Sequence, residues 1–117
     1  VEQAAGGLWS TPSDLAQLIV EVIKSNKNES NLVISKEMTR QLLTAQRGIG
    51  GLGFLITYED ERPRFGHNGW NEGYHSLIIG NPDKGQGYVW MSNGENGAKL
   101  GMEVTRGLVK ALGWTWY

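Results

Sequence analysis

The most informative stretch of the sequence is GHNGWNEGY, at residues 66–74. It lies at the start of an apolar run, residues 74–80, that is typical of a β-strand. Taken alone, the stretch reads as a glycine-bounded turn, because a single histidine in a loop is more often structural than catalytic. The segments around it are therefore needed to interpret it.

Strand-like runs lie on both sides of this stretch. Residues 52–58 alternate apolar side chains with smaller or polar ones, and a charged turn at 59–63 leads into a second strand. The runs 74–80 and 88–93 are separated by the turn residues 81–85, which predicts an antiparallel hairpin. We therefore expect an antiparallel sheet in the second half of the chain.

Both faces of that sheet need a cover. Leu77 and Ile79 occupy one face of their strand, and Tyr74 and Ile78 occupy the other. A C-terminal helix is expected to cover one face. Its apolar residues are Leu100, Val104, Leu108, Ala111 and Leu112, and Gly113 follows them as a C-terminal cap.

Two further helices are expected before the sheet. Thr11 is a strong N-cap, because its hydroxyl can accept from free N–H groups of the first turn. The apolar residues that follow repeat at helical spacing, at Leu15, Leu18, Ile19, Val22 and Ile23. Ser35 is a second cap, for a shorter helix that includes Ala45 and stops before Gly48. The predicted fold class is α+β, an antiparallel sheet flanked by helices, in a single domain of residues 1–117.

Composition and charge exclude several kinds of partner. The 117 residues include 11 basic and 12 acidic side chains, a net charge of -1, with no long run of either sign. Nucleic acid is therefore not an expected partner. The absence of cysteine excludes disulfides and cysteine-type zinc sites, and leaves the compartment open. No apolar stretch approaches the roughly 20 residues that cross a bilayer.

Metal and nucleotide sites are not expected either. His67, Glu72 and His75 could each bind a metal, but they match no ligand motif, and a strand would direct Glu72 and His75 to opposite faces. The glycine-rich residues 48–53 lack the Lys-Ser/Thr pair of a phosphate-binding loop. We therefore expect no metal and no cofactor.

Three other segments accompany GHNGWNEGY in a fixed order. They are AGGLWSTPSDLA at residues 5–16, GLGF at 51–54, and NPD at 81–83 with MSNG at 91–94. Together they resemble the family of class C β-lactamases, penicillin-binding D-alanyl peptidases, D-aminopeptidases and related esterases. The resemblance extends from about residue 4 to residue 112 and implies the C-terminal portion of a β-lactamase/transpeptidase-like fold. It also implies a serine hydrolase that cleaves an amide, a β-lactam or an ester.

The resemblance implies a role for each residue of the histidine motif. His67 stands in the place of the lysine of Lys-Thr-Gly, near the attacking serine. Asn68 and Gly69 would contact the substrate, Gly69 because it has no side chain. The backbone N–H of Trp70 resembles the second donor of the family's oxyanion hole.

The nucleophile motif of the family, Ser-x-x-Lys, occurs nowhere in the sequence, since no serine is followed three residues later by lysine. The family's Tyr-x-Asn element is also missing in its usual place, because Tyr74-His75-Ser76 comes after the histidine motif. We therefore expect that the serine lies in an N-terminal half that precedes Val1, and that this chain alone is inactive. That half is an expected partner, beside a small-molecule or peptide substrate. The resemblance suggests a periplasmic or extracellular protein, and uncovered apolar surface could cause self-association.

A second class of function stays open at this stage. The chain has several aromatic residues that could stack on sugars, namely Trp9, Trp70, Tyr74, Tyr88, Trp90, Trp114 and Trp116. A non-catalytic β-rich module that binds peptidoglycan or glycans is the alternative. A core or interface position is the simpler expectation for each aromatic except Trp70, which follows a glycine of the motif.

Overall fold

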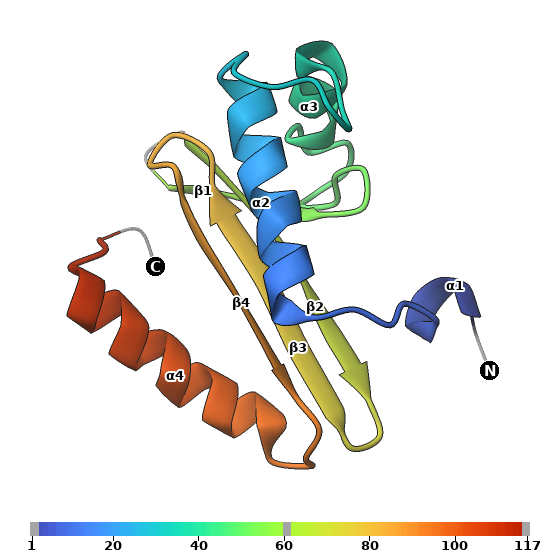
Figure 1. The fold of residues 1–117 in the computed structure, drawn as a ribbon, viewed down its shortest axis with the longest axis vertical. Helices are drawn as coiled ribbons and strands as arrows, with labels where there is room; N and C mark the ends of the chain where they lie inside the picture. Colours follow the sequence, from blue (N-terminus) through green and yellow to red (C-terminus); the bar gives the residue numbers. More distant parts are fainter. Residues whose placement is uncertain (1–2, 60–61, 116–117) are drawn as a thin grey trace.

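The computed structural model describes residues 3–59 and 62–115. A four-stranded antiparallel sheet with strand order β1-β2-β3-β4 forms its centre (Figure 1). The strands are β1 (Leu55–Glu59), β2 (Arg62–Asn71), β3 (Tyr74–Asn81) and β4 (Gln86–Ser92). The helices are α1 (Gln3–Gly6), α2 (Pro12–Asn26), α3 (Lys36–Leu42) and α4 (Gly97–Leu112). The predicted α+β class with an antiparallel sheet is confirmed.

The helix ends follow the capping residues of the sequence. The Thr11 hydroxyl accepts from the Asp14 N–H at 3.2 Å, and the Ser35 hydroxyl accepts from the Met38 N–H at 3.2 Å. Gly113 ends α4 in the left-handed conformation, with φ of 63°. The short helix α1 was not predicted, because four residues are too few to show a helical period.

Helices α2 and α4 cover opposite faces of the sheet. Residues that are directly opposite in a ladder share a face, and so do residues two apart on a strand. Ile19 of α2 packs on Gly87, where an added Cβ would lie 2.6 Å from the Ile19 Cγ2 atom. Gly101 of α4 packs on the Trp90 indole. Because Gly87 and Trp90 are three apart on β4, the two helices lie on different faces, here called the α2 face and the α4 face.

The hydrophobic core lies on the α2 face. Its buried members are Ile19, Val22, Ile23, Leu43, Ile56, Phe65 and Ile78. Phe65 is 0% exposed and its ring meets that of Phe54 edge-on, with the centroids 5.0 Å apart. A side chain at Gly80 would overlap the Phe65 ring, so glycine is needed opposite Phe65.

Strand β1 and helix α3 are shorter than predicted. β1 begins at Leu55 and not at residue 52, because residues 50–53 form a loop in which the Gly51 N–H donates to the Phe54 carbonyl at 2.8 Å. Residues predicted as a charged turn at 59–63 belong partly to strands β1 and β2, and residues 60–61 of that turn lie outside the described residues. α3 ends at Leu42, so Ala45 lies beyond it. The chain closes a tight loop there, with the Gln46 N–H donating to the Gly50 carbonyl at 2.7 Å.

The face that α4 turns to the sheet differs from the prediction. Leu100 and Val104 are exposed, whereas the buried residues of α4 are Gly97, Gly101 and Thr105. These three positions are four apart and form one stripe along the helix. The bulk of Trp90 explains the difference, because the helix can approach this indole only where it carries no side chain. Within residues 3–59 and 62–115, no helix has the length and apolar character needed to cross a membrane.

Candidate functional site

Strand β2 extends beyond Leu55, the first residue of β1. Its pairs with β1 run from Glu59↔Arg62 to Leu55↔Gly66, whereas its pairs with β3 continue to Asn71↔Tyr74. Within the part of the chain that the structure describes, residues 67–71 therefore have a strand on one side only. This segment, which we call the open edge, carries all four residues of the predicted histidine motif.

The direction of the backbone along the open edge follows from one hydrogen bond. The Ile56 N–H donates to the Ile49 carbonyl at 2.7 Å, so it points away from β2. The pair Ile56↔Phe65 is therefore of the non-hydrogen-bonded kind, and the backbone groups of Phe65 point to β3. The ladder has no bulge from Phe65 to residue 71, so the direction alternates regularly. The N–H groups of Asn68 and Trp70 consequently point outward from the open edge.

The side chains of the motif divide between the two faces of β2. His67 and Gly69 share the α2 face with Phe65, and both lie at the exposed end of the strand. Asn68 and Trp70 lie on the α4 face, where the Trp70 side chain is 79% exposed. The structure thus brings His67 and the outward N–H of Trp70 to one edge, while it places the side chains of His67 and Asn68 on different faces.

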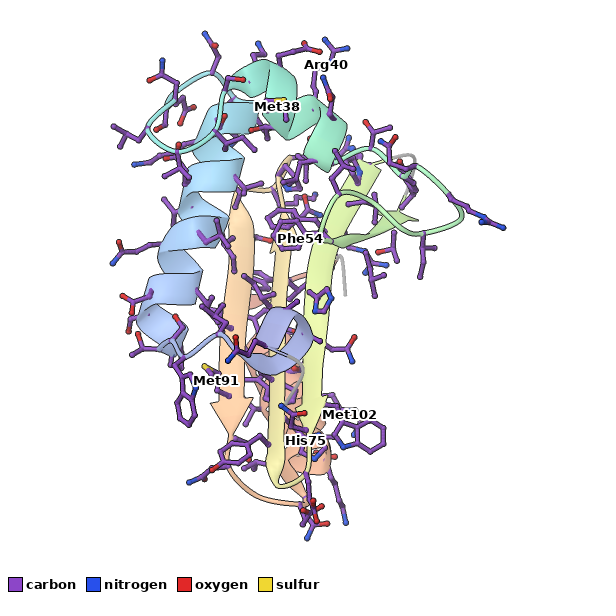
Figure 2. The ribbon with its side chains drawn as sticks, turned by 90° about the vertical axis from the view of Figure 1, so that its right-hand side faces the viewer. Met38, Arg40, Phe54, His75, Met91 and Met102 are labelled. Atoms are coloured by element: carbon purple, nitrogen blue, oxygen red, sulfur yellow. The ribbon has the colours of Figure 1, made fainter. Side chains whose placement is uncertain are left out.

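A groove of about 1210 Å³ runs along the open edge. Its second side is the segment 3–10, and a side chain at Gly6 would come within 3.0 Å of the Asn71 side-chain nitrogen. α1 lies beyond β2 in Figure 1, and Figure 2 views the molecule from that side, with α1 in front of the strands. Among the described residues that line the groove there is no aspartate or glutamate.

Two features of the groove were missed by sequence reasoning. Trp9, on the side opposite the open edge, is 91% exposed and lines the groove, although the simpler expectation for it was a core or interface position. Ser76 of β3 lies directly opposite Gly69 and also lines the groove. The alternation of residues 74, 76 and 78 was a usable signal for Ser76, but only with the register of β2 and β3 known.

His75 is a core histidine of the α4 face. It is 8% exposed, its ring lies 5.7 Å from that of Trp70, and its Cδ2 atom would contact a side chain at Gly97 at 3.0 Å. Its Nε2 atom has no hydrogen-bond partner among the described residues. His67 lies on the opposite face of the sheet. The described residues contain no group of three or more metal-binding side chains.

Glu21 lies on α2, outside the groove, and the pKa of its carboxyl is lowered. The Ser30 hydroxyl donates to a Glu21 carboxylate oxygen at 2.7 Å and, with the weaker bond from the Val33 N–H at 3.3 Å, holds the pKa of Glu21 below its usual value. These bonds stabilise the fold above the pKa of the unfolded carboxyl, and their contribution is lost as the pH falls through the lowered folded pKa. The loop that carries Ser30 and Val33 is thus fixed to α2 at neutral pH.

Comparison with known families agrees with the fold. The model of the family described as Beta-lactamase matches residues 1–112. The chain belongs to the beta-lactamase family. Searches of the curated proteins and of the solved structures gave no significant match. The resemblance seen in the sequence is therefore confirmed, and with it a serine hydrolase-like fold for this beta-lactamase-family chain.

Proposed function

We propose that this chain forms one side of the acyl-transfer site of a serine hydrolase, whose nucleophile is supplied by residues outside the 117. The open edge of β2 is the observation that carries the proposal. It presents the Trp70 N–H outward, beside an exposed His67, along a groove whose described lining residues include no acidic side chain. Two further observations support the proposal that the nucleophile lies outside these 117 residues. The chain belongs to the beta-lactamase family, and it lacks the Ser-x-x-Lys motif.

In the proposed reaction, a serine hydroxyl attacks an amide, β-lactam or ester carbonyl to form an acyl-enzyme, which water then hydrolyses. Negative charge develops on the carbonyl oxygen in both steps. The Trp70 N–H is one of the donors that stabilise this charge, because it is fixed by the strand and points into the groove. Gly69 allows the substrate to approach β2, and the imidazole of His67 supplies a polar or cationic group beside the serine.

We further propose that an N-terminal half of the protein packs against surfaces that this chain leaves exposed. Leu100, Met102 and Val104 of α4 are exposed apolar side chains. β4 ends the described sheet on the side opposite β1, and α4 and α2 cover its two faces. An edge strand of this kind can pair with a further strand. Without such a partner, the same surfaces would favour self-association of the chain.

Substitution of His67 tests the proposal in the protein that contains this chain and its serine. His67→Ala is expected to lower kcat/KM for nitrocefin or a p-nitrophenyl ester by about tenfold or more, because a polar group beside the nucleophile is lost. The melting temperature should change little, because the imidazole is exposed. Lys99→Ala is the matched control, since Lys99 is also exposed but lies on α4, outside the groove. An unchanged rate in His67→Ala would contradict the proposal.

A further inference from the structure

Three asparagines of the chain are followed directly by glycine, a pair that is prone to deamidation. They are Asn68, Asn93 and Asn96, and all three are exposed. The reaction is an attack of the glycine nitrogen on the asparagine side chain, and glycine carries no side chain that would hinder it. Because exposure does not separate the three sites, the backbone N–H of each glycine decides which of them can react.

The glycine that follows Asn68 is held in the sheet. The backbone groups of Phe65 point to β3 and the direction alternates regularly along β2, so the Gly69 N–H points to β3 as well. Its partner in that ladder is Ser76. A ladder hydrogen bond keeps the proton on the nitrogen and fixes the backbone. Asn68 is therefore protected, although its side chain is exposed.

The glycine that follows Asn96 is held at the start of α4. The Gly97 N–H donates to the Gly94 carbonyl at 2.8 Å, and Gly97 is buried. A side chain at position 97 would lie 2.7 Å from the Ser92 Oγ atom, so this part of the backbone is closely packed and cannot rotate freely. Asn96 is therefore protected as well.

The glycine that follows Asn93 has neither restraint. β4 ends at Ser92 and α4 begins at Gly97, so residues 93 and 94 lie in the turn between them, at the lower end of the sheet in Figure 1. Among the described residues, no group accepts a hydrogen bond from the Gly94 N–H. Apart from its chain neighbours, the nearest described atom that a side chain at position 94 would meet is the Ser92 Oγ atom, at 4.0 Å. The Gly94 nitrogen can therefore lose its proton and approach the Asn93 side chain.

We propose that Asn93 is a site of spontaneous deamidation, at which a carboxylate enters the groove. The Gly94 nitrogen gives its proton to a base in the solvent and attacks the Asn93 Cγ atom. The N–Cγ bond forms and the Cγ–Nδ2 bond breaks, and the side-chain nitrogen takes up a proton and leaves as ammonia. Water then opens the resulting succinimide ring. Opening at Cγ gives aspartate, and opening at the backbone carbonyl carbon gives isoaspartate.

The product changes the charge of the groove. Asn93 lines the groove, and none of the described lining residues is an aspartate or a glutamate. The carboxylate formed at position 93 would be the first acidic side chain among them. It would also make the formal net charge of the chain more negative than -1, so an anion exchanger can separate the two forms. The inference goes beyond the proposed function and does not depend on it, because the reaction needs only residues 93 and 94 and water.

The test measures deamidation at each site in the complete protein that contains this chain. The folded protein is kept in a mildly alkaline buffer, and a protease that cleaves after Glu95 separates Asn93 from Asn96 for mass spectrometry. Asn93 should deamidate at least about tenfold faster than Asn68 and Asn96, the factor that corresponds to one backbone hydrogen bond that must first break. In concentrated urea the three sites should react at similar rates, because unfolding removes the ladder and the helix that protect two of them.

Two variants serve as matched controls. Asn93→Gln keeps a side-chain amide but closes the larger ring far more slowly, so the amount of the acidic form on the anion exchanger should fall. Asn96→Gln makes the same change at a protected site and should leave that amount unchanged. Equal rates at the three sites of the folded protein, or a faster reaction at Asn68 or Asn96, would overturn the inference. So would a reaction at Asn93 that occurs in urea and not in the folded protein.

Discussion

Replacing Trp70 with proline is expected to lower kcat of the serine-containing protein by about 10²–10³-fold, the usual loss for one oxyanion donor. Proline removes the backbone N–H that points outward from the open edge of β2. No sheet hydrogen bond should be lost, because that N–H does not face β3, and proline is tolerated at such edge positions. Gly69, the preceding residue, is already in a strand, which is the conformation that proline requires before it.

Trp70→Ala separates the N–H from the indole. This variant keeps the donor and loses a side chain that is 79% exposed, so kcat should stay within about threefold of the parent. Circular dichroism and thermal melting would show whether both variants keep the fold. Equal rates for the proline and alanine variants would mean that the Trp70 N–H is not a donor to the transition state.

Phe65→Ala is expected to be the most destabilising single truncation in the core, with a loss of about 3–5 kcal/mol in the free energy of unfolding. Phe65 is 0% exposed, and its ring fills the space between Phe54 and the backbone of Gly80. Truncation would leave a cavity that Gly80 cannot fill, since glycine has no side chain. Urea unfolding measures the change directly.

Leu32→Ala is the matched control for the core prediction. Leu32 is also a large apolar residue, but it is 87% exposed, so its truncation should change the free energy of unfolding by less than about 0.5 kcal/mol. Similar losses in the two variants would show that the core does not lie between α2 and the sheet.

The sequence predicted those features that depend on residues close together in the chain, such as helix caps and the alternation of side chains along a strand. Thr11 and Ser35 cap their helices, and the opposite directions of Leu77 and Ile78 on β3 correctly placed a cover on each face of the sheet. The packing face of α4 could not be predicted in this way. An apolar period singles out Leu100 and Val104, whereas the contact depends on the small residue Gly101, which carries no hydrophobic signal.

The sequence identified the residues of the candidate site but not their arrangement in space. The four residues His67, Asn68, Gly69 and Trp70 were identified by family resemblance, and they lie together on the open edge. That the edge is open depends on where β1 begins, and this is set by the glycine loop at residues 50–53 and the bond from the Ile56 N–H to Ile49. Ser76 could not be found without the strand register, because it is seven residues from Gly69 in the chain.

We propose that this chain supplies one side of a serine hydrolase site and that its own serines are not the nucleophile. Covalent labelling with a fluorophosphonate, followed by digestion and mass mapping, tests this most directly. In the complete protein, the label should map to the serine of a Ser-x-x-Lys motif outside the 117 residues, and the isolated chain should stay unlabelled. A stoichiometric adduct on Ser76 or on any other serine of this chain would show that the chain carries its own nucleophile.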